Sequence, residues 1–312
     1  MKRLLHTDPI PDALSGAVIA LGNFDGFHLG HQAVVGRAVQ RAAHEGRPAI
    51  VATFDPHPVR FFKPDAAPFR LTSLDQREEL FAHAGADAML VFDFGAALAA
   101  TPAAGFVELL AERLGASGVV TGDDFTFGRG RDGNVEVLRH LGAARGIVAE
   151  TVAPVHLDGE IVSSSRIREA LQAGDPGSAT RLLTRPFAVR GEVIHGNKRG
   201  RAFGWPTANM KLGRYLRPAY GVYAVRTRLP DGRELDGVAN LGKRPMFEPE
   251  ELLEVNIFGF EGDLYGQEIE IDLHHYIRPE AKLDSIDALI AQIGKDADEA
   301  RALLNPPSSL RT

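Results

Sequence analysis

The chain has 312 residues, contains no cysteine and carries a formal net charge of −6. Without cysteine there are no disulfide bonds, no thiol catalysis and no thiolate zinc site. The acidic balance disfavours general nucleic-acid binding, and no apolar run approaches the length of a membrane-spanning helix. The length suits two domains, and 44% hydrophobic residues support a sizeable core in each. The lack of cysteine fits a cytoplasmic location, and we expect no nucleic-acid or membrane partner, while a homo-oligomer stays open.

Apolar segments alternate with helical patterns between about residues 17 and 162. The predicted strands are 17–21, 49–54, 88–92, 118–122 and 147–152, and the predicted helices are 32–44, 74–84, 101–114 and 135–144. This alternation is typical of a parallel, doubly wound α/β sheet. Ligands of such sheets bind at the carboxyl ends of the strands, so the turns that follow strands are the first candidates for function.

A strand-to-helix turn follows the first of these strands. Its sequence is Leu21-Gly22-Asn23-Phe24-Asp25-Gly26-Phe27-His28-Leu29-Gly30-His31. Glycine lets the backbone approach a ligand closely, and the start of the next helix offers free N–H groups to a phosphate. His28 and His31 can add hydrogen-bond donors beside that anion. A nucleotide site, a plain surface loop and a metal site with two histidine ligands all fit this turn taken alone.

Two later turns suit a ligand that has both a flat ring and phosphates. The loop 122–131 combines glycines with Phe125 and two arginines, and aromatic faces stack on rings while arginine forks bind phosphates. Ser164, Arg166 and Arg168 open a predicted helix, where hydroxyl and N–H groups can cradle an anion. An exposed loop and ordinary serine capping are the alternatives.

The pattern changes near residue 185, where we place the boundary between domains 1–185 and 186–312. Beyond it come the predicted strands 187–194, 221–229, 234–241, 252–260 and 268–277, followed by an amphipathic helix at 285–304. Successive strands joined by hairpin turns favour an antiparallel β-barrel with a helix at its end. The expected fold class is therefore α/β followed by β.

Polar residues of the second domain gather in two segments. Gly196, Lys198, Gly200 and Arg201 form a basic glycine loop, which covers a phosphate or is merely solvated.

The second segment is a turn fixed by Pro206, which directs the side chains of Thr207 and Asn209 the same way. Their hydroxyl and amide oxygens suit Mg²⁺, and the alternative is that these side chains only stabilise the turn. Glu254 lies in an otherwise apolar predicted strand, either as a base or as an edge-strand charge.

The first-domain motifs resemble, in order, the adenylyltransferase half of the bacterial bifunctional FAD synthetase family. These motifs are Gly22 to His31, Thr53-Phe54-Asp55-Pro56-His57-Pro58, the 122–131 loop and Ser164-Ser165-Arg166-Ile167-Arg168. The resemblance implies a Rossmann-like nucleotidyltransferase domain that binds ATP and FMN. The FMN phosphate would attack the α-phosphorus of ATP, releasing pyrophosphate and leaving FAD.

The resemblance also implies residue roles in that half. His28 and His31 would stabilise charge on the reacting phosphates, and Gly22 to Asp25 would lie along the nucleotide. The leaving triphosphate end would be held by Ser164, Arg166 and Arg168. Candidates for the flavin side are Asp55, Pro56, Pro58 and Phe125.

The second-domain motifs resemble the riboflavin kinase module of the same family. They are Gly204-Trp205-Pro206-Thr207-Ala208-Asn209, Gly221-Val222-Tyr223-Ala224-Val225, Asn240 to Pro245, the Glu254 strand and Asp263-Leu264-Tyr265-Gly266. The resemblance implies that Thr207, with Asn209, binds Mg²⁺ carried by ATP. Glu254 would act as base toward the ribityl 5′-hydroxyl of riboflavin, which attacks the γ-phosphorus. Flavins are then substrates and products.

Three residues beside the kinase motifs depart from the family pattern, namely Asn256, Gly259 and Met246. They bear on kinase rate or flavin affinity and not on the type of reaction. A nucleotidyltransferase with a single activity would lack Thr207, Asn209 and Glu254 in a barrel. A flavin-binding regulator would not need a base at Glu254.

Overall fold

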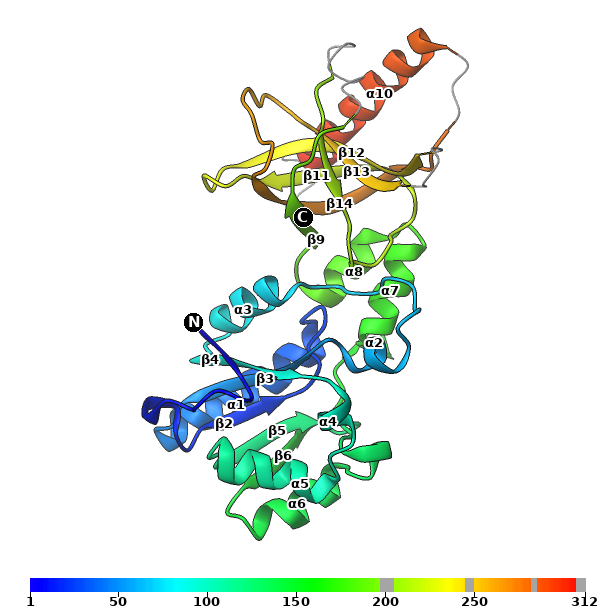
Figure 1. The fold of residues 1–312 in the computed structure, drawn as a ribbon. Coiled ribbons are helices and arrows are strands. Elements are labelled where there is room, and N and C mark those ends of the chain that lie inside the picture. The colour runs from blue at the N-terminus through cyan, green and yellow to red at the C-terminus, as the bar shows by residue number, and fades with distance from the viewer. Residues whose placement is uncertain (197–204, 245–249, 282–284, 307–312) are drawn as a thin grey trace. The chain divides into compact units, whose positions relative to one another are not determined.

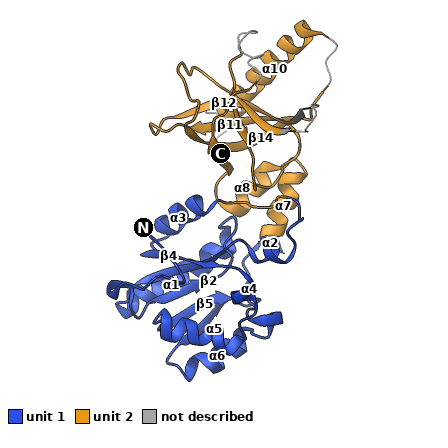
Figure 2. Ribbon diagram, viewed as in Figure 1, with its two compact units in different colours: residues 1–67, 73–163 blue, residues 68–72, 164–312 orange. Residues whose placement is uncertain are grey.

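The computed structural model describes residues 1–196, 205–244, 250–281 and 285–306 (Figure 1). Contacts divide the chain into two compact units, one of residues 1–67 and 73–163, the other of residues 68–72 and 164–312 (Figure 2). The units therefore part at residues 163 and 164. The domain boundary that we place near residue 185 stays a prediction.

A six-stranded parallel sheet forms the centre of the first unit. Its strands are β1 (Lys2–Leu5), β2 (Val18–Leu21), β3 (Ala49–Asp55), β4 (Ala88–Asp93), β5 (Gly118–Gly122) and β6 (Val148–Val152), in the spatial order β1-β4-β3-β2-β5-β6. This confirms the predicted doubly wound sheet. The strand order reverses at β2 and β5, so the loops that leave these two strands flank the usual ligand crevice.

Helices cover this sheet. They are α1 (Leu29–Glu45), α2 (Pro58–Phe62), α3 (Leu74–His83), α4 (Ala96–Ala99), α5 (Ala103–Glu108) and α6 (Val135–Ala143). α1 begins three residues before the predicted start, because His28 caps it. The predicted helix 101–114 begins at Ala103, with Pro102 as its N-cap, and continues as a π-helical turn at Leu109–Arg113.

Neighbouring residues of the central strands point into different apolar layers. Ile19 and Leu21 belong to one buried cluster, whereas Val18 and Ala20 belong to another. Because successive side chains of a strand face opposite ways, a strand that is covered on both faces must be apolar throughout. This explains why these strands are unbroken apolar runs in the sequence.

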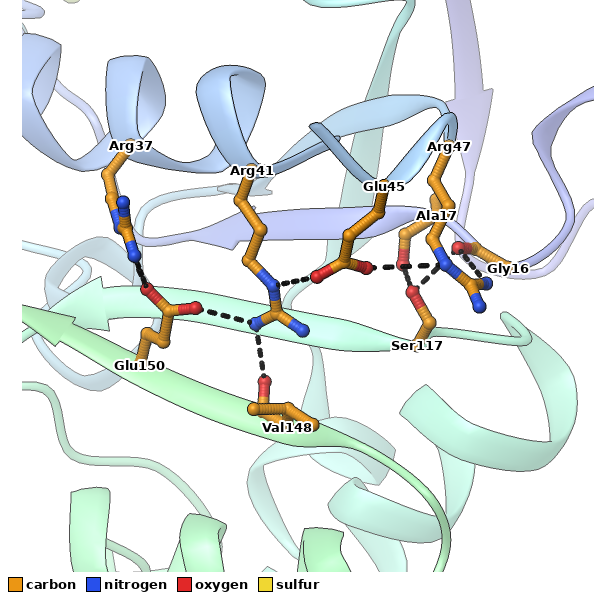
Figure 3. Close-up of polar contacts among 9 residues, drawn as sticks. All are labelled: Gly16, Ala17, Arg37, Arg41, Glu45, Arg47, Ser117, Val148 and Glu150. Carbon is orange, nitrogen blue, oxygen red and sulfur yellow. Dashed lines mark hydrogen bonds and ion pairs between the residues drawn. The ribbon is translucent and has the colours of Figure 1, made fainter. Parts of the chain in front are cut away.

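An arginine network joins α1 to the edge strand β6 (Figure 3). The Arg41 side chain is 9% exposed and donates to Glu45 Oε1 at 2.6 Å and to the Val148 carbonyl at 3.0 Å. Glu150 pairs with Arg41 at 3.1 Å and with Arg37 at 2.8 Å. Because Val148 is the first residue of β6, this network lies at the amino end of the sheet.

The described residues of the second unit form two helices, a six-stranded antiparallel sheet and a final helix. Its elements are α7 (Ser164–Gln172), α8 (Pro176–Leu183), β9 (Phe187–Glu192), β10 (Ala208–Lys211), β11 (Gly221–Arg228), β12 (Glu234–Arg244), β13 (Glu250–Ile257), β14 (Glu268–Arg278) and α10 (Ile286–Leu304). The strand order is β10-β13-β12-β11-β14-β9. Within the described ranges, a bridge in which the Ile194 amide donates to the Asn209 carbonyl at 2.8 Å brings the two ends of the sheet together.

The predicted antiparallel barrel with a terminal helix is thereby confirmed. α10 covers one face of the barrel, where Ala297, Ala300 and Leu304 form a buried cluster with Val222 and Val238. The sequence interpretation did not include β1, β10 or the small hairpin of β7 (His156–Leu157) and β8 (Glu160–Ile161). Among the described residues, no helix is both long enough and apolar enough to cross a membrane.

Acidic side chains of β14 pair with arginines of its two neighbouring strands, β9 and β11. Glu270 is buried and pairs with Arg190 at 2.9 Å and with Arg228 at 2.5 Å. Burial and the neighbouring Glu270 charge raise the pKa of Asp272 to about 6, from 3.8. The ionised form of Asp272 therefore costs the folded state free energy at neutral pH.

Replacing Asp272 with asparagine should alter the pH dependence of barrel stability. The raised pKa contributes stability that is fully present below about pH 4 and is lost as the pH rises through about 6. The free energy of unfolding of Asp272→Asn, relative to wild type, should therefore rise by about 2 to 3 kcal/mol between pH 4 and pH 7. Denaturant unfolding followed by the fluorescence of the single tryptophan, Trp205, measures this, and a difference that is flat with pH would contradict it.

Candidate active sites

The turn between β2 and α1 brings the two predicted histidines together. His28 caps α1, and its Nδ1 accepts a hydrogen bond from the His31 amide at 3.4 Å. The two imidazole rings stack with centroids 3.6 Å apart and planes inclined by 20°. Both rings thus stand at the positive end of a seventeen-residue helix, where backbone N–H groups favour an anion.

Left-handed backbone angles shape this turn. Phe24 has φ 51° and Phe27 has φ 46°, values that are uncommon for residues other than glycine. Both side chains are buried and meet Phe81 of α3 edge to face, at centroid distances of 5.7 and 5.2 Å. A Cβ on Gly30 would come within 3.2 Å of the His28 ring, so glycine there leaves room for the imidazole.

A buried arginine lies behind the same turn. Arg77 of α3 is 3% exposed, and its Nη1 donates to the Asn23 carbonyl at 3.2 Å and to Thr53 Oγ1 at 2.8 Å. The Thr53 hydroxyl itself donates to the Asn23 carbonyl at 2.8 Å. Sequence reasoning missed this residue. The available signal was an arginine four residues before Phe81, on the apolar face of a predicted helix.

The other predicted turns of the first unit leave the strands on either side of β2. Asp55 ends β3, and His57 caps the short helix α2, its Nδ1 accepting from the Val59 amide at 3.2 Å. Phe125 follows β5 and stacks on the buried Phe127 at 5.8 Å. Because parallel strands end at one edge, these turns and the histidine turn share the carboxyl edge of the sheet.

The third segment that we predict to bind phosphate, residues 164–168, belongs to the second compact unit. Ser164 and Arg166 lie half-buried at the start of α7. Arg168 Nε donates to the Phe69 carbonyl at 2.8 Å, and its guanidinium lies 5.3 Å from the Phe69 ring centroid. Arg168 thus has a structural partner within its own unit, and the roles of all three side chains stay predictions.

The strand register of the barrel aligns three polar side chains. Glu254 of β13 lies opposite Asn209 of β10 on one side and opposite Asn240 of β12 on the other. Residues that are directly opposite each other in an antiparallel sheet project from the same face. Val238, two residues before Asn240 on β12, packs in the cluster under α10, so this is the outer face of the barrel.

The turn before β10 is held by side-chain amides. Asn209 Nδ2 donates to the Thr207 carbonyl at 3.2 Å, and Asn256 Nδ2 donates to the Pro206 carbonyl at 2.8 Å. A Cβ on Gly196 would come within 2.5 Å of Asn209 Nδ2, so the backbone at Gly196 lies close to the Asn209 side chain. Asn256, which departs from the family pattern, therefore supports the Thr207 turn.

Gly259 has φ 66°, a backbone conformation that favours glycine over the acidic residue common in the family. Lys198, Gly200, Arg201 and Met246 lie outside the described residues.

Each unit matches a different protein-family model. The model of FAD synthetase matches residues 10–166, and the model of riboflavin kinase matches residues 183–304. The fold and the sites thus define a two-part transferase of flavin metabolism.

Relatives match almost the whole chain. The bifunctional riboflavin kinase/FMN adenylyltransferase of Pseudomonas fluorescens is 41% identical and the match covers 93% of this chain and 94% of the relative. The protein of the same name from Haemophilus influenzae is 40% identical, with 94% and 96% covered. This chain belongs to the bifunctional riboflavin kinase/FMN adenylyltransferase family.

A solved structure also matches both units. The crystal structure named as a macrolide-efflux protein from Streptococcus pneumoniae has a TM-score of 0.86 and 32% identity, and the match covers 98% of this chain and all of that one. The family membership rests on the relatives and the family models, and this similarity adds that the complete fold recurs.

A methyl group at position 30 should impair FMN adenylylation. Gly30→Ala places a Cβ against the His28 ring, so the histidine pair must shift, and we expect FMN adenylylation to fall about tenfold because small displacements of positioning groups are costly. Riboflavin phosphorylation should not change. Steady-state rates of both reactions measure the effect.

Gly36→Ala is the matched control, since Gly36 lies on the same helix and a Cβ there meets no atom within 4 Å. Equal loss of FMN adenylylation in Gly30→Ala and Gly36→Ala would show that the activity does not depend on the space beside His28.

Proposed function

We propose that the second unit phosphorylates riboflavin to FMN and that the first unit adenylylates that FMN to FAD, each with its own ATP. One observation carries the proposal. The chain matches the family models of two different activities: FAD synthetase over residues 10–166, most of which lie in the first unit, and riboflavin kinase over residues 183–304 of the second unit.

In the first unit, the proposed reaction needs alignment and charge neutralisation more than covalent chemistry. The FMN phosphate attacks the α-phosphorus of ATP in line with the departing pyrophosphate. His28 and His31, together with the amino end of α1, stabilise the charge on these phosphates. Gly22 to Asp25 lie along the nucleotide.

The turns on either side complete this proposed site. Asp55, Pro56, Pro58 and Phe125 are the proposed flavin side; they follow β3 and β5, the two strands that flank β2. Ser164, Arg166 and Arg168 stay the proposed ligands of the leaving phosphates.

In the second unit, the proposed base is Glu254. Its carboxylate accepts the proton of the ribityl 5′-hydroxyl while that oxygen attacks the γ-phosphorus of ATP, and ADP leaves. Asn209 and Asn240, aligned with Glu254 on the same face, orient groups around that oxygen.

A magnesium ion carried by ATP fits the residues beside this base. The described residues include no group of three or more histidine, aspartate or glutamate side chains that could hold a metal by themselves. Mg²⁺ needs no such cage, since it commonly takes one or two protein oxygens with phosphates and water. The hydroxyl of Thr207 and the amide oxygen of Asn209 are donors of this type, and the ion would neutralise phosphate charge there.

We also propose that residues 1–185 and 186–312 are the functional domains and that the chain works in the cytoplasm with small-molecule substrates. A time course with riboflavin, ATP and Mg²⁺, resolved by chromatography, tests the function. FMN that appears before FAD is expected. A chain that binds flavin without consuming ATP would be the flavin-binding regulator instead.

Replacing the proposed kinase base should separate the two activities. Glu254→Gln keeps the size of the side chain but cannot accept the proton, so FMN formation should fall by about a hundredfold or more. FMN supplied directly should still be converted to FAD. Glu268→Gln, on an exposed position of β14, is the control and should leave both rates unchanged.

Removing a histidine from the first site should have the opposite effect. His31→Ala should allow riboflavin to be phosphorylated but slow FAD formation by about a hundredfold, so that FMN accumulates. His44→Ala, in the exposed last turn of the same helix, should behave like wild type. If His31→Ala and Glu254→Gln each impaired both steps equally, the assignment of activities to units would be wrong.

A further inference from the structure

α3 carries two side chains that reach the turns of the proposed adenylyltransferase site without belonging to either turn. Arg77 and Phe81 are four residues apart and therefore lie on one face of the helix. Phe81 packs on the rings of Phe24 and Phe27. The helix begins at a capping box, in which Ser73 and Gln76 bond each other's backbone amides, so its first turn is fixed.

Arg77 joins two strands through one guanidinium group. Its Nη1 reaches the carbonyl of Asn23 after β2 and the hydroxyl of Thr53 in β3, and its Nη2 lies 3.9 Å from Asp55 Oδ1 at the end of β3. Thr53 is fully buried, and its hydroxyl donates to the same Asn23 carbonyl, so that Arg77, Thr53 and Asn23 are all bonded to one another. A guanidinium with several fixed donors suits such a node, which a lysine ammonium on a flexible stem does not reproduce.

We propose that Arg77 is a positioning residue for FMN adenylylation, which sets the ATP turn at Asn23 and the flavin turn at Asp55 relative to each other. This inference rests on the proposed assignment of those turns to ATP and FMN. A buried cation that served the core alone could be paired anywhere along the sheet. Arg77 instead makes its contacts at the carboxyl ends of β2 and β3, where ligands of such sheets bind.

The test measures KM for ATP and for FMN in FAD formation by the full chain. Arg77→Met should raise both KM values about tenfold, because it removes two charge-assisted hydrogen bonds, one to Asn23 in the ATP turn and one to Thr53 in β3 just before the flavin turn. Arg77→Lys keeps the charge and should restore part of the effect. Riboflavin phosphorylation by the same samples reports whether the second unit is intact and should not change.

Arg41→Met is the matched control. Arg41 is another nearly buried arginine of the first unit that donates to a backbone carbonyl, but it does so at the amino end of the sheet, where Figure 3 shows it against Val148. Its loss should lower the melting temperature of the first unit much as Arg77→Met does, yet leave both KM values unchanged. A merely structural role for Arg77 would give the two variants the same kinetic behaviour.

Thr53→Val gives a second approach that does not require Arg77→Met to fold. It removes the hydroxyl that joins Arg77 to Asn23 while nearly keeping the shape of the side chain, so both KM values should rise. Combined with Arg77→Lys, it should add little further, because the two residues act through one node.

Three results would overturn the inference while the wild type still makes FAD. They are unchanged KM values in Arg77→Lys and Thr53→Val, a change for one substrate alone, and fully additive effects in the double variant. A wild type that made no FAD from FMN would contradict the proposed function, and this inference with it.

Discussion

The turn between β2 and α1 places phenylalanine backbones in the left-handed region, and the packing of the first unit has to hold them there. Each such residue costs on the order of 1 kcal/mol. Burying the Phe24 and Phe27 rings against Phe81 offsets this cost, since a fully buried aromatic side chain contributes roughly 2 to 3 kcal/mol. The histidine pair therefore depends on α3, a helix with no ligand-binding motif of its own.

The two units position their polar groups in different ways. In the first, apolar strands bury both faces and leave chemistry to the turns at one edge, so the side chains that act are carried by loops and helix starts. In the second, alternation along β13 buries Leu253 and Val255 inside the barrel and sends Glu254 outward between two asparagines. A turn can accept varied residues, whereas a strand position fixes the neighbours of its side chain through register.

Local patterns in the sequence predicted most of the fold. β3, β4 and β5 were found nearly to the residue, because their apolar runs end at proline, glycine or acidic residues. β1 and β10 were missed, since neither is an unbroken apolar run like the equally short β2, and both owe their conformation to partner strands. The pairing of His28 with His31 followed from their spacing. The alignment of Asn209 with Glu254 and the bonds of Arg77 did not, because each joins segments that are distant in sequence.

In the part of the chain that the structure describes, the barrel closes at the bridge between Ile194 and Asn209, and Asn209 is also a proposed magnesium ligand. Closure of the barrel and binding of the nucleotide then both depend on Asn209. By thermodynamic linkage, each of the two processes favours the other. A bound nucleotide would stabilise the bridge between Ile194 and Asn209, and a barrel that opened at this bridge would release the nucleotide. The Ile194 amide hydrogen would exchange with solvent more slowly in the occupied barrel than in the empty one.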